Sequence, residues 1–387
     1  MSAPPSLDGV WASASVTWPV TSTVTHALRG AIAGSTEVIG HDPATGRVWL
    51  RGHVLADLRE IEADALAFLL AHGERPRDLP EHDLRWALVR EELHTAMRLP
   101  PELHEWLATT PASASPAGLM LTALSWLGCH VEHQHMPADA AALDLLAPMR
   151  LLGHVLGLAI ALGRRQRGMP LVQPVAPTLT LSARLLAETR NAAAYDPPSP
   201  AHVAALDDLI LACADLGLTP GTLAGLTVAS CEADWHTSAC AALAGWTAEL
   251  RAVAAAEVGA SAAPARSALG VPGEAPSGPA SAARAAPEAL PDDRRDLLRQ
   301  VVHAVDPSGD ATPADHSTLE LAWQVLRRLG VEPLMIPCVL AVVRASGFLA
   351  RVAEQRRDNR IMRPLARYVG PAVRPVPPRG AAGATLA

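Results

Sequence analysis

RASGFLARVAEQRRDNRIMRPLARYVG, residues 344–370, is the stretch that decides the fold. Its apolar residues recur at three- and four-residue spacing from Ala345 to Val352, which predicts a helix. A polar run follows at Glu354–Arg360, and an Arg-Pro pair stands at residues 363–364. Helical geometry must stop there, because proline has no N–H and restricts the residue before it.

Two arginines, Arg344 and Arg363, bracket this stretch. A guanidinium group stays charged at any working pH and binds carboxylates through paired hydrogen bonds. Both residues are therefore candidates for carboxylate recognition. On spacing alone, arginines that simply face solvent are the simpler interpretation.

The pattern RxxGFxAxxxEQRxDNRxxRPxxxYVG closely resembles the C-terminal signature of the citrate synthase family. The resemblance implies a mainly α, citrate synthase-like multihelical fold with a short N-terminal β-hairpin and a reduced small domain. In that family the first arginine binds an oxaloacetate carboxylate, and the second comes from the neighbouring subunit of an obligate dimer. The matching positions are Arg344 and Arg363, which we predict to be substrate-binding.

The composition favours packed helices. Of 387 residues, 49% are hydrophobic and only 3% are aromatic, and the abundant alanine and leucine suit helices better than sheets. The formal charge of −7 argues against a nucleic-acid partner. The five cysteines form no CxxC pair, which is typical of reduced thiols. Without a charged-then-apolar leader or a run of about 18 apolar residues, we expect a cytoplasmic protein with no membrane partner.

Periodicity and composition also suggest an order of elements. The piece DPATGR predicts a turn between two short β-prone runs within 28–58. Helical spacing follows at 60–72, 82–98, 101–109, 116–128 and 140–163. We expect a large helical domain in two parts, at 25–251 and 314–371, separated by a reduced small domain at 252–313. The small domain is mostly an Ala/Pro/Gly-rich linker. A flexible arm at 1–24 and a disordered tail at 372–387 are expected at the two ends.

Three histidines lie close together in CHVEHQHMPAD, namely His130, His133 and His135. Such a cluster invites a metal interpretation. The spacing does not place all three on one helical face, and no second cluster accompanies them, so we expect a solvated loop and no metal. His154, on an apolar helix, is expected in the core or an interface.

The family's catalytic motifs are missing in register. The resemblance places the substrate-binding histidine on Leu216, the histidine of the loop that closes on coenzyme A on Arg251, and the catalytic aspartate on Leu319. A slip of one to four residues offers Asp315 or Glu320 as a displaced carboxylate. The positions of the expected catalytic groups therefore carry no matching chemistry.

The family reaction is a Claisen-type condensation of an acyl-CoA thioester with oxaloacetate. A carboxylate removes the proton alpha to the thioester, one histidine stabilises the enol, and another polarises the oxaloacetate carbonyl. Proton abstraction and electrophilic stabilisation each contribute on the order of hundreds-fold or more. The resemblance thus implies a coenzyme A thioester as substrate and no covalently bound cofactor, while the loop that would close on coenzyme A is not matched.

We therefore expect a citrate synthase-like protein that is non-catalytic or weakly active, dimerises and binds a dicarboxylate. The dimer is either a homodimer or a heterodimer with an intact citrate synthase paralogue. Two alternatives stay open. One is an active acyltransferase of the citrate or 2-methylcitrate type that uses Glu249, Arg251, Asp315 or Glu320 as substituted groups. The other is an enzyme of secondary metabolism built on the same pocket.

Overall fold

The computed structural model describes residues 34–131, 140–171, 179–190, 197–257, 292–307 and 316–363, without the side chains of 131, 140–144, 248 and 251–257. Nearly all of them belong to one compact unit, Thr36–Met362. Every described helix and strand lies within this unit. The arm at 1–24, the tail at 372–387, His133, His135 and Asp315 lie outside the described residues.

A small antiparallel sheet opens the unit. It has the order β1-β2-β3, with β1 at Ile39–His41, β2 at Val48–Leu50 and β3 at His53–Val54. Gly46, at φ 74°, lies in the turn between the first two strands, where a residue with a Cβ would be strained. The predicted hairpin is confirmed, and the structure adds a short third strand.

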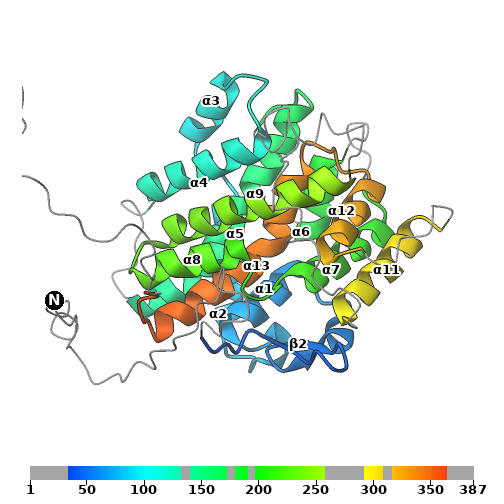
Figure 1. The fold of residues 1–387 in the computed structure, drawn as a ribbon. Coiled ribbons are helices and arrows are strands. Elements are labelled where there is room, and N and C mark those ends of the chain that lie inside the picture. The colour runs from blue at the N-terminus through cyan, green and yellow to red at the C-terminus, as the bar shows by residue number, and fades with distance from the viewer. Residues whose placement is uncertain are drawn as a thin grey trace, which may run out of the picture. The chain divides into compact units, whose positions relative to one another are not determined.

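Helices form the rest of the unit (Figure 1). They are α1 (Ala63–His72), α2 (Arg85–Ala96), α3 (Pro101–Thr109), α4 (Pro116–Val131), α5 (Ala140–Gln166), α6 (Leu181–Thr189), α7 (Pro200–Cys213), α8 (Pro220–Ser230), α9 (Trp235–Glu257), α11 (Asp293–Val305), α12 (Thr318–Arg328) and α13 (Ile336–Arg357). Two 3₁₀ turns, Leu55–Leu58 and Pro76–Asp78, connect the first elements. The predicted mainly α fold is confirmed, and the five predicted helical segments correspond to α1 to α5.

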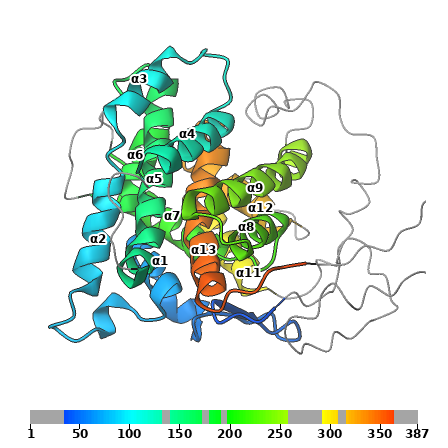
Figure 2. The same cartoon turned by 90° about the vertical axis from the view of Figure 1, so that its left-hand side faces the viewer.

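Helix α13 is the axis of the core. Every residue from Ile336 to Val352 is buried, and the helix contacts α1, α5, α7, α8 and α9. Figure 2 shows it running between α5 on one side and α8 and α9 on the other. Gly347 allows the closest of these approaches, because a Cβ there would lie 1.8 Å from the Ala214 carbonyl oxygen. The stretch that marks the fold in the sequence is thus also its physical centre.

Two helices are long and apolar enough to cross a membrane by length and composition alone. They cover Leu145–Gln166 and Ile336–Arg357, and 89% and 94% of their most apolar windows are buried inside the fold. Helices this deeply packed against protein are what a large apolar core requires. We therefore interpret both as core helices.

The segment predicted to be a reduced small domain is described only at its edges. Helix α9 continues to Glu257, past the predicted boundary at 251. Helix α11 packs against α7 and α12 within the same compact unit. Asp293 also ties α11 to the sheet, through its backbone N–H to the Gly46 carbonyl and its carboxylate, which accepts from the Val48 N–H. The domain boundaries given by the sequence stay predictions.

A buried pair of histidines lies in the core between α5 and α9. His154 and His236 are each 4% exposed, and their ring nitrogens Nδ1 and Nε2 lie 3.1 Å apart. Burial lowers the pKa of His154 to about 3 and that of His236 to about 4. The nearby Arg150 lowers both pKa values further, whereas Asp234 raises that of His236. The pair is therefore neutral at pH 7, as expected for core residues.

We expect this pair to make the fold acid-labile. The unfolded histidines bind protons below about pH 6.5, whereas the folded ones do not until about pH 4. Stability is therefore fully present above pH 6.5 and falls as the pH drops through this window, by up to about 1.4 kcal/mol per pH unit for each histidine. Urea unfolding at several pH values gives the slope with which the free energy of unfolding falls as the pH drops. This slope should be smaller for H154M than for the wild type. Replacing exposed His82 should leave the slope unchanged, and an unchanged slope in H154M would contradict the account.

Candidate functional site

Arg344 lies near the middle of α13 and is 1% exposed. Its guanidinium carbon stands 4.7 Å from the ring centre of Phe348, one turn along the same helix, and 5.0 Å from that of Trp246 on α9. Aromatic faces attract a desolvated cation by about 2 kcal/mol or more. The two rings therefore fix the guanidinium plane inside the core.

The polar partners of Arg344 come from the connection between α7 and α8. Its Nη1 donates to the Cys213 carbonyl at 3.4 Å, and its Nη2 donates to the hydroxyls of Thr219 and Thr222, both at 3.3 Å. Among the described residues its Nε–H has no hydrogen-bond partner. A guanidinium has five N–H donors, and buried donors without partners are costly. This buried arginine thus has unused capacity to bind a further acceptor.

A tight turn presents these partners. Asp215 accepts the Gly217 N–H at 2.6 Å and pairs with Arg351 of α13 at 2.6 Å, with side chains only 1% and 5% exposed. Gly217 has φ 79°, which permits the turn. Leu216, the position that the resemblance gives to the substrate-binding histidine, lies half-buried within the turn. The local geometry is held by Asp215 and Arg351, while the side chain that would carry the chemistry is apolar.

Glu249 on α9 supplies a second carboxylate to the site. Its Oε1 accepts the Gly221 N–H at 2.5 Å, at the start of α8. Helix N-termini favour negative charge through their free N–H groups and the helix dipole. A Cβ on Gly221 would lie 2.8 Å from the Ala242 carbonyl oxygen and 3.1 Å from this Oε1. Glycine at this position therefore leaves room for the carboxylate.

The charges of the site act on one another. Burial is the main cause that raises the pKa of Glu249, and the Gly221 N–H, the Arg344 charge and the Thr219 hydroxyl partly offset it. Burial lowers the pKa of the Arg344 guanidinium, and the charges of Asp215 and Glu249 act in the opposite direction. The site is thus an electrically coupled cluster and not an isolated cation.

The other predicted catalytic positions lie elsewhere or outside the described part. Leu319 is partly buried against the core at the start of α12. Glu320 forms a capping box with Ser317, so its carboxylate is committed to the N-terminus of its own helix. The side chain of Arg251 and all of Asp315 lie outside the described residues. Arg363 falls outside the compact unit, in the part that includes Met1–Ser35. Their roles stay predictions.

The histidine cluster gives no described metal site. His130 is exposed on the last turn of α4, and its ring stacks on Trp126 at a centroid distance of 3.6 Å. Among the described residues, no group of three or more histidine, cysteine or acidic side chains is placed to hold a metal ion.

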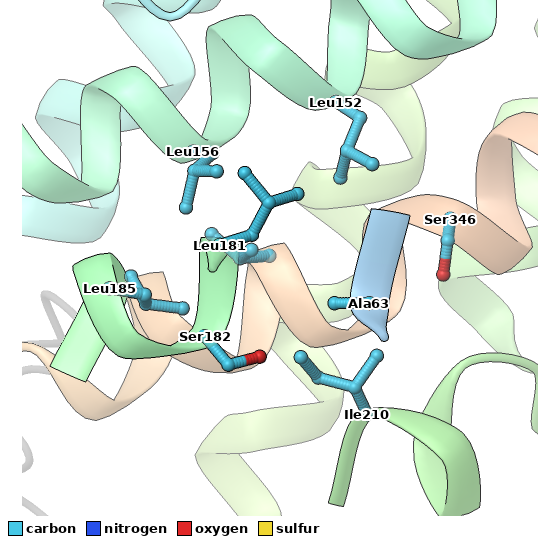
Figure 3. A pocket seen from close by; sticks show the side chains of 9 residues that line it. Ala63, Leu152, Leu156, Leu181, Ser182, Leu185, Ile210 and Ser346 are labelled. Carbon is cyan, nitrogen blue, oxygen red and sulfur yellow. The ribbon is translucent and has the colours of Figure 1, made fainter. Parts of the chain in front are cut away.

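One small cavity has a lining that does not include Arg344. Figure 3 shows the side chains that line it. The cavity measures about 20 Å³, and its walls are apolar except for Ser182 and Ser346. Ser182 donates to Asp207 at 2.5 Å, and burial raises the pKa of that carboxyl to about 6. The cavity has room for about one water molecule, so it is too small for a substrate.

The sequence analysis did not identify several residues that contact Arg344 or the turn that supports it. Trp246 and Arg351 touch Arg344 or its supporting turn from distant positions in the sequence, whereas Phe348 lies one helical turn after Arg344 on the same helix. Arg351 carried a signal, since it lies seven residues, or two helical turns, after Arg344 on the same helix. Trp246 carried none.

Comparison with known proteins identifies the family. The family model described as "Citrate synthase, C-terminal domain" matches residues 27–268, which is more than half of the chain. This chain belongs to the citrate synthase family. Within the citrate synthase family, a curated relative is the 2-methylcitrate synthase of Mycobacterium tuberculosis, 27% identical over 218 residues that cover 56% of this chain and 52% of the relative. The citrate synthase of Mycolicibacterium smegmatis is 24% identical over 217 residues, 56% of this chain and 54% of that one.

The chain thus spans about half the length of the curated relatives it matches. Solved citrate synthases share the fold over a longer stretch. The enzyme from Thermotoga maritima superposes with a TM-score of 0.69 at 16% identity, over 92% of this chain and 98% of that one. Citrate synthase from Thermoplasma acidophilum was solved as a ternary complex with carboxymethyl coenzyme A and oxaloacetate. It superposes with a TM-score of 0.68 at 15% identity, over 90% of this chain and 97% of that one. Identities this low establish the fold alone.

Proposed function

We propose that this chain is a non-catalytic member of the citrate synthase family that forms a dimer and keeps a carboxylate-recognition pocket around Arg344. The observation that carries the proposal is a contrast between Arg344 on α13 and Leu216 in the turn between α7 and α8. Arg344 is buried, stacked and held by three polar contacts, whereas Leu216 stands where the family has its substrate-binding histidine. Recognition of a carboxylate is supported, and the condensation is not.

The chemistry explains why this contrast matters. A leucine side chain has no proton to donate and no dipole to direct at an oxaloacetate carbonyl. Leu319, at the position of the family's aspartate, cannot accept the alpha proton of an acyl-CoA. General acid–base catalysis contributes about 10²–10⁴-fold, and residues that act as a unit lose most of the rate when one is removed. Without those groups, any residual condensation is expected to be very slow.

The surface of α4, α8 and α9 supports the dimer. From Pro116 to Val131, from Pro220 to Ser230 and from Trp235 to Thr247, the sequence contains no arginine, lysine, aspartate or glutamate. Helix α9 contacts both α4 and α8, and the exposed positions on the three helices are mostly small, such as Gly118, Thr122 and Ala244. An uncharged face with small side chains suits close packing against a second copy. We expect sedimentation to give the mass of a dimer.

The same face would accept an intact citrate synthase paralogue instead of a second copy. In such a heterodimer this chain would contribute structure and a regulatory carboxylate pocket, and its partner would contribute the chemistry. We infer a cytoplasmic location, with no nucleic-acid or membrane partner, from the acidic balance of the chain and its family.

Glu249 favours a second candidate, an active acyltransferase of the citrate or 2-methylcitrate type. It is a partly buried carboxylate with a raised pKa within the site of Arg344, and such groups can serve as general bases. In this alternative Glu249 takes the alpha proton of the acyl-CoA.

Thiol release tests the proposal. The purified protein is incubated alone with oxaloacetate and either acetyl-CoA or propionyl-CoA, and free coenzyme A is measured. We expect release no faster than with heat-treated protein. Clear turnover with either thioester would refute the non-catalytic assignment, and loss of that turnover in E249Q would favour the second candidate.

A further inference from the structure

The polar cluster around Arg344 already contains a carboxylate of the chain itself. Glu249 accepts the N–H at the start of α8 and the hydroxyl hydrogen of Thr219. The same Thr219 hydroxyl accepts from Arg344 Nη2 at 3.3 Å. The carboxylate of Glu249 therefore reaches Arg344 through one shared hydroxyl, and it takes up the anion-binding helix terminus beside it.

The charges around this carboxylate leave no excess of positive charge. Arg344 and Arg351 on α13 are positive, whereas Asp215 after α7, Glu249 on α9 and Glu354, 3.9 Å from Arg351, are negative. Arg294 on α11 adds a more distant positive charge, which Asp292 neutralises at 2.6 Å. Cys213 contributes no charge, because burial raises the pKa of its thiol to about 12. A dianionic ligand entering this cluster would meet no net positive charge.

We propose that Glu249 is a built-in counter-ion of the Arg344 pocket, which excludes dicarboxylates while it is ionised and admits them when it is protonated. The inference rests on the proposed function, because it takes Arg344 as the anchor for a ligand carboxylate. Glu249 would then determine specificity and couple ligand binding to the uptake of one proton.

Physical reasoning supports this coupling. The Nε–H of Arg344 has no hydrogen-bond partner among the described residues. A ligand carboxylate that binds it would come close to the Glu249 carboxylate, which contacts the Nη2 side of Arg344 through Thr219, and like charges in a dry site repel strongly. Protonation removes this repulsion and also the countercharge that Glu249 presents to Arg344. Burial already favours the protonated form, since it raises the pKa of Glu249. Protonation of Glu249, by a fall in pH or by a proton taken up together with the ligand, would therefore open the pocket.

Calorimetric titration of L-malate, a stable four-carbon dicarboxylate, tests the proposal. The titrations compare the wild type, E249Q and E105Q at several pH values between about 8 and 6. Glu105 is exposed on α3, so E105Q changes the net charge equally without touching the site. Glutamine at 249 keeps an oxygen for the Gly221 N–H and removes the charge.

We expect wild-type affinity to rise as the pH falls, by up to about tenfold per pH unit for one coupled proton. E249Q should bind at least about tenfold more tightly than the wild type near pH 8, without this pH dependence, and E105Q should behave as the wild type. Binding that is equally tight at all pH values in the wild type and E249Q would overturn the inference and leave the carboxylate pocket intact.

Two further outcomes distinguish a failure of the inference from a failure of the proposed function. No malate binding by any of the three proteins would overturn both the inference and the carboxylate part of the proposed function. Binding by E249Q that survives in E249Q/R344Q would show that Arg344 is not the anchor, and it would refute the proposed pocket. The pH dependence of the wild type needs no substitution, so the inference stays testable if E249Q does not fold.

Discussion

R351M is expected to lower the free energy of unfolding by about 3 to 5 kcal/mol. Arg351 pairs with Asp215 at 2.6 Å, and both side chains are almost completely buried. Removing the guanidinium leaves the Asp215 carboxylate as an uncompensated charge in the core. That carboxylate also receives the Gly217 N–H, so the turn that carries Thr219 should loosen with it. Urea unfolding monitored by circular dichroism gives the loss directly.

A double-mutant cycle separates the ion pair from the packing. In R351M/D215N the stranded charge is gone and asparagine can still accept the Gly217 N–H, so the double variant should be more stable than R351M alone. R360M is the control, because Arg360 and its neighbour Asp358 are 81% and 84% exposed and 3.8 Å apart. It should unfold almost as the wild type does. If R351M lowered the free energy of unfolding as little as R360M does, the result would contradict the account of this pair.

G347A is expected to destabilise the protein by at least about 3 kcal/mol, at the upper end for overpacked cores. The added methyl group would stand 1.8 Å from the Ala214 carbonyl oxygen and 3.1 Å from the Asp215 Cα. Both are backbone atoms, so α13 must move away from the α7–α8 turn as a body. Because that turn supplies the contacts of Arg344, malate binding should be lost together with stability.

G118A is the matched control for this substitution. Gly118 lies exposed in the first turn of α4, and a Cβ there would meet only Ser115 atoms at 3.8 Å and 4.0 Å. Alanine should be neutral or should stabilise by up to about 1 kcal/mol, since it reduces the freedom of the unfolded chain. A melting temperature for G347A equal to that of G118A would show that α13 does not approach the turn as closely as described.

Local periodicity was enough to predict the helices. Segments such as 101–109 and 140–163 carry their apolar residues at helical spacing, and α3 and α5 appear there with bounds that differ by at most three residues. The end of α9 was harder to predict. Alanine has high helix propensity, so Ala252–Ala256 continue the helix that composition assigned to a linker.

The candidate site was predictable only in part. Arg344 was recognisable from the motif around it. The role of Glu249 was not, because it depends on a contact with Gly221, which lies 28 residues away on another helix. Phe348 stands at the i+4 position from Arg344 on the same helix, whereas Trp246 has the pattern of an ordinary core residue until the structure places Arg344 near its ring. Tertiary contacts of this kind leave no periodic trace in the sequence.

Exchange of the acetyl protons of acetyl-CoA with solvent deuterium tests the central claim most directly, because it reports proton abstraction without requiring the complete reaction. The protein is incubated in deuterium oxide with acetyl-CoA and L-malate as a stand-in for oxaloacetate, and the methyl signal is followed by NMR. The account predicts no exchange above that of buffer, since the resemblance places the catalytic aspartate on Leu319 and the histidine of the coenzyme A loop on Arg251. Exchange well above buffer in the wild type, abolished in E249Q and retained in E105Q, would contradict the account and identify Glu249 as a working base.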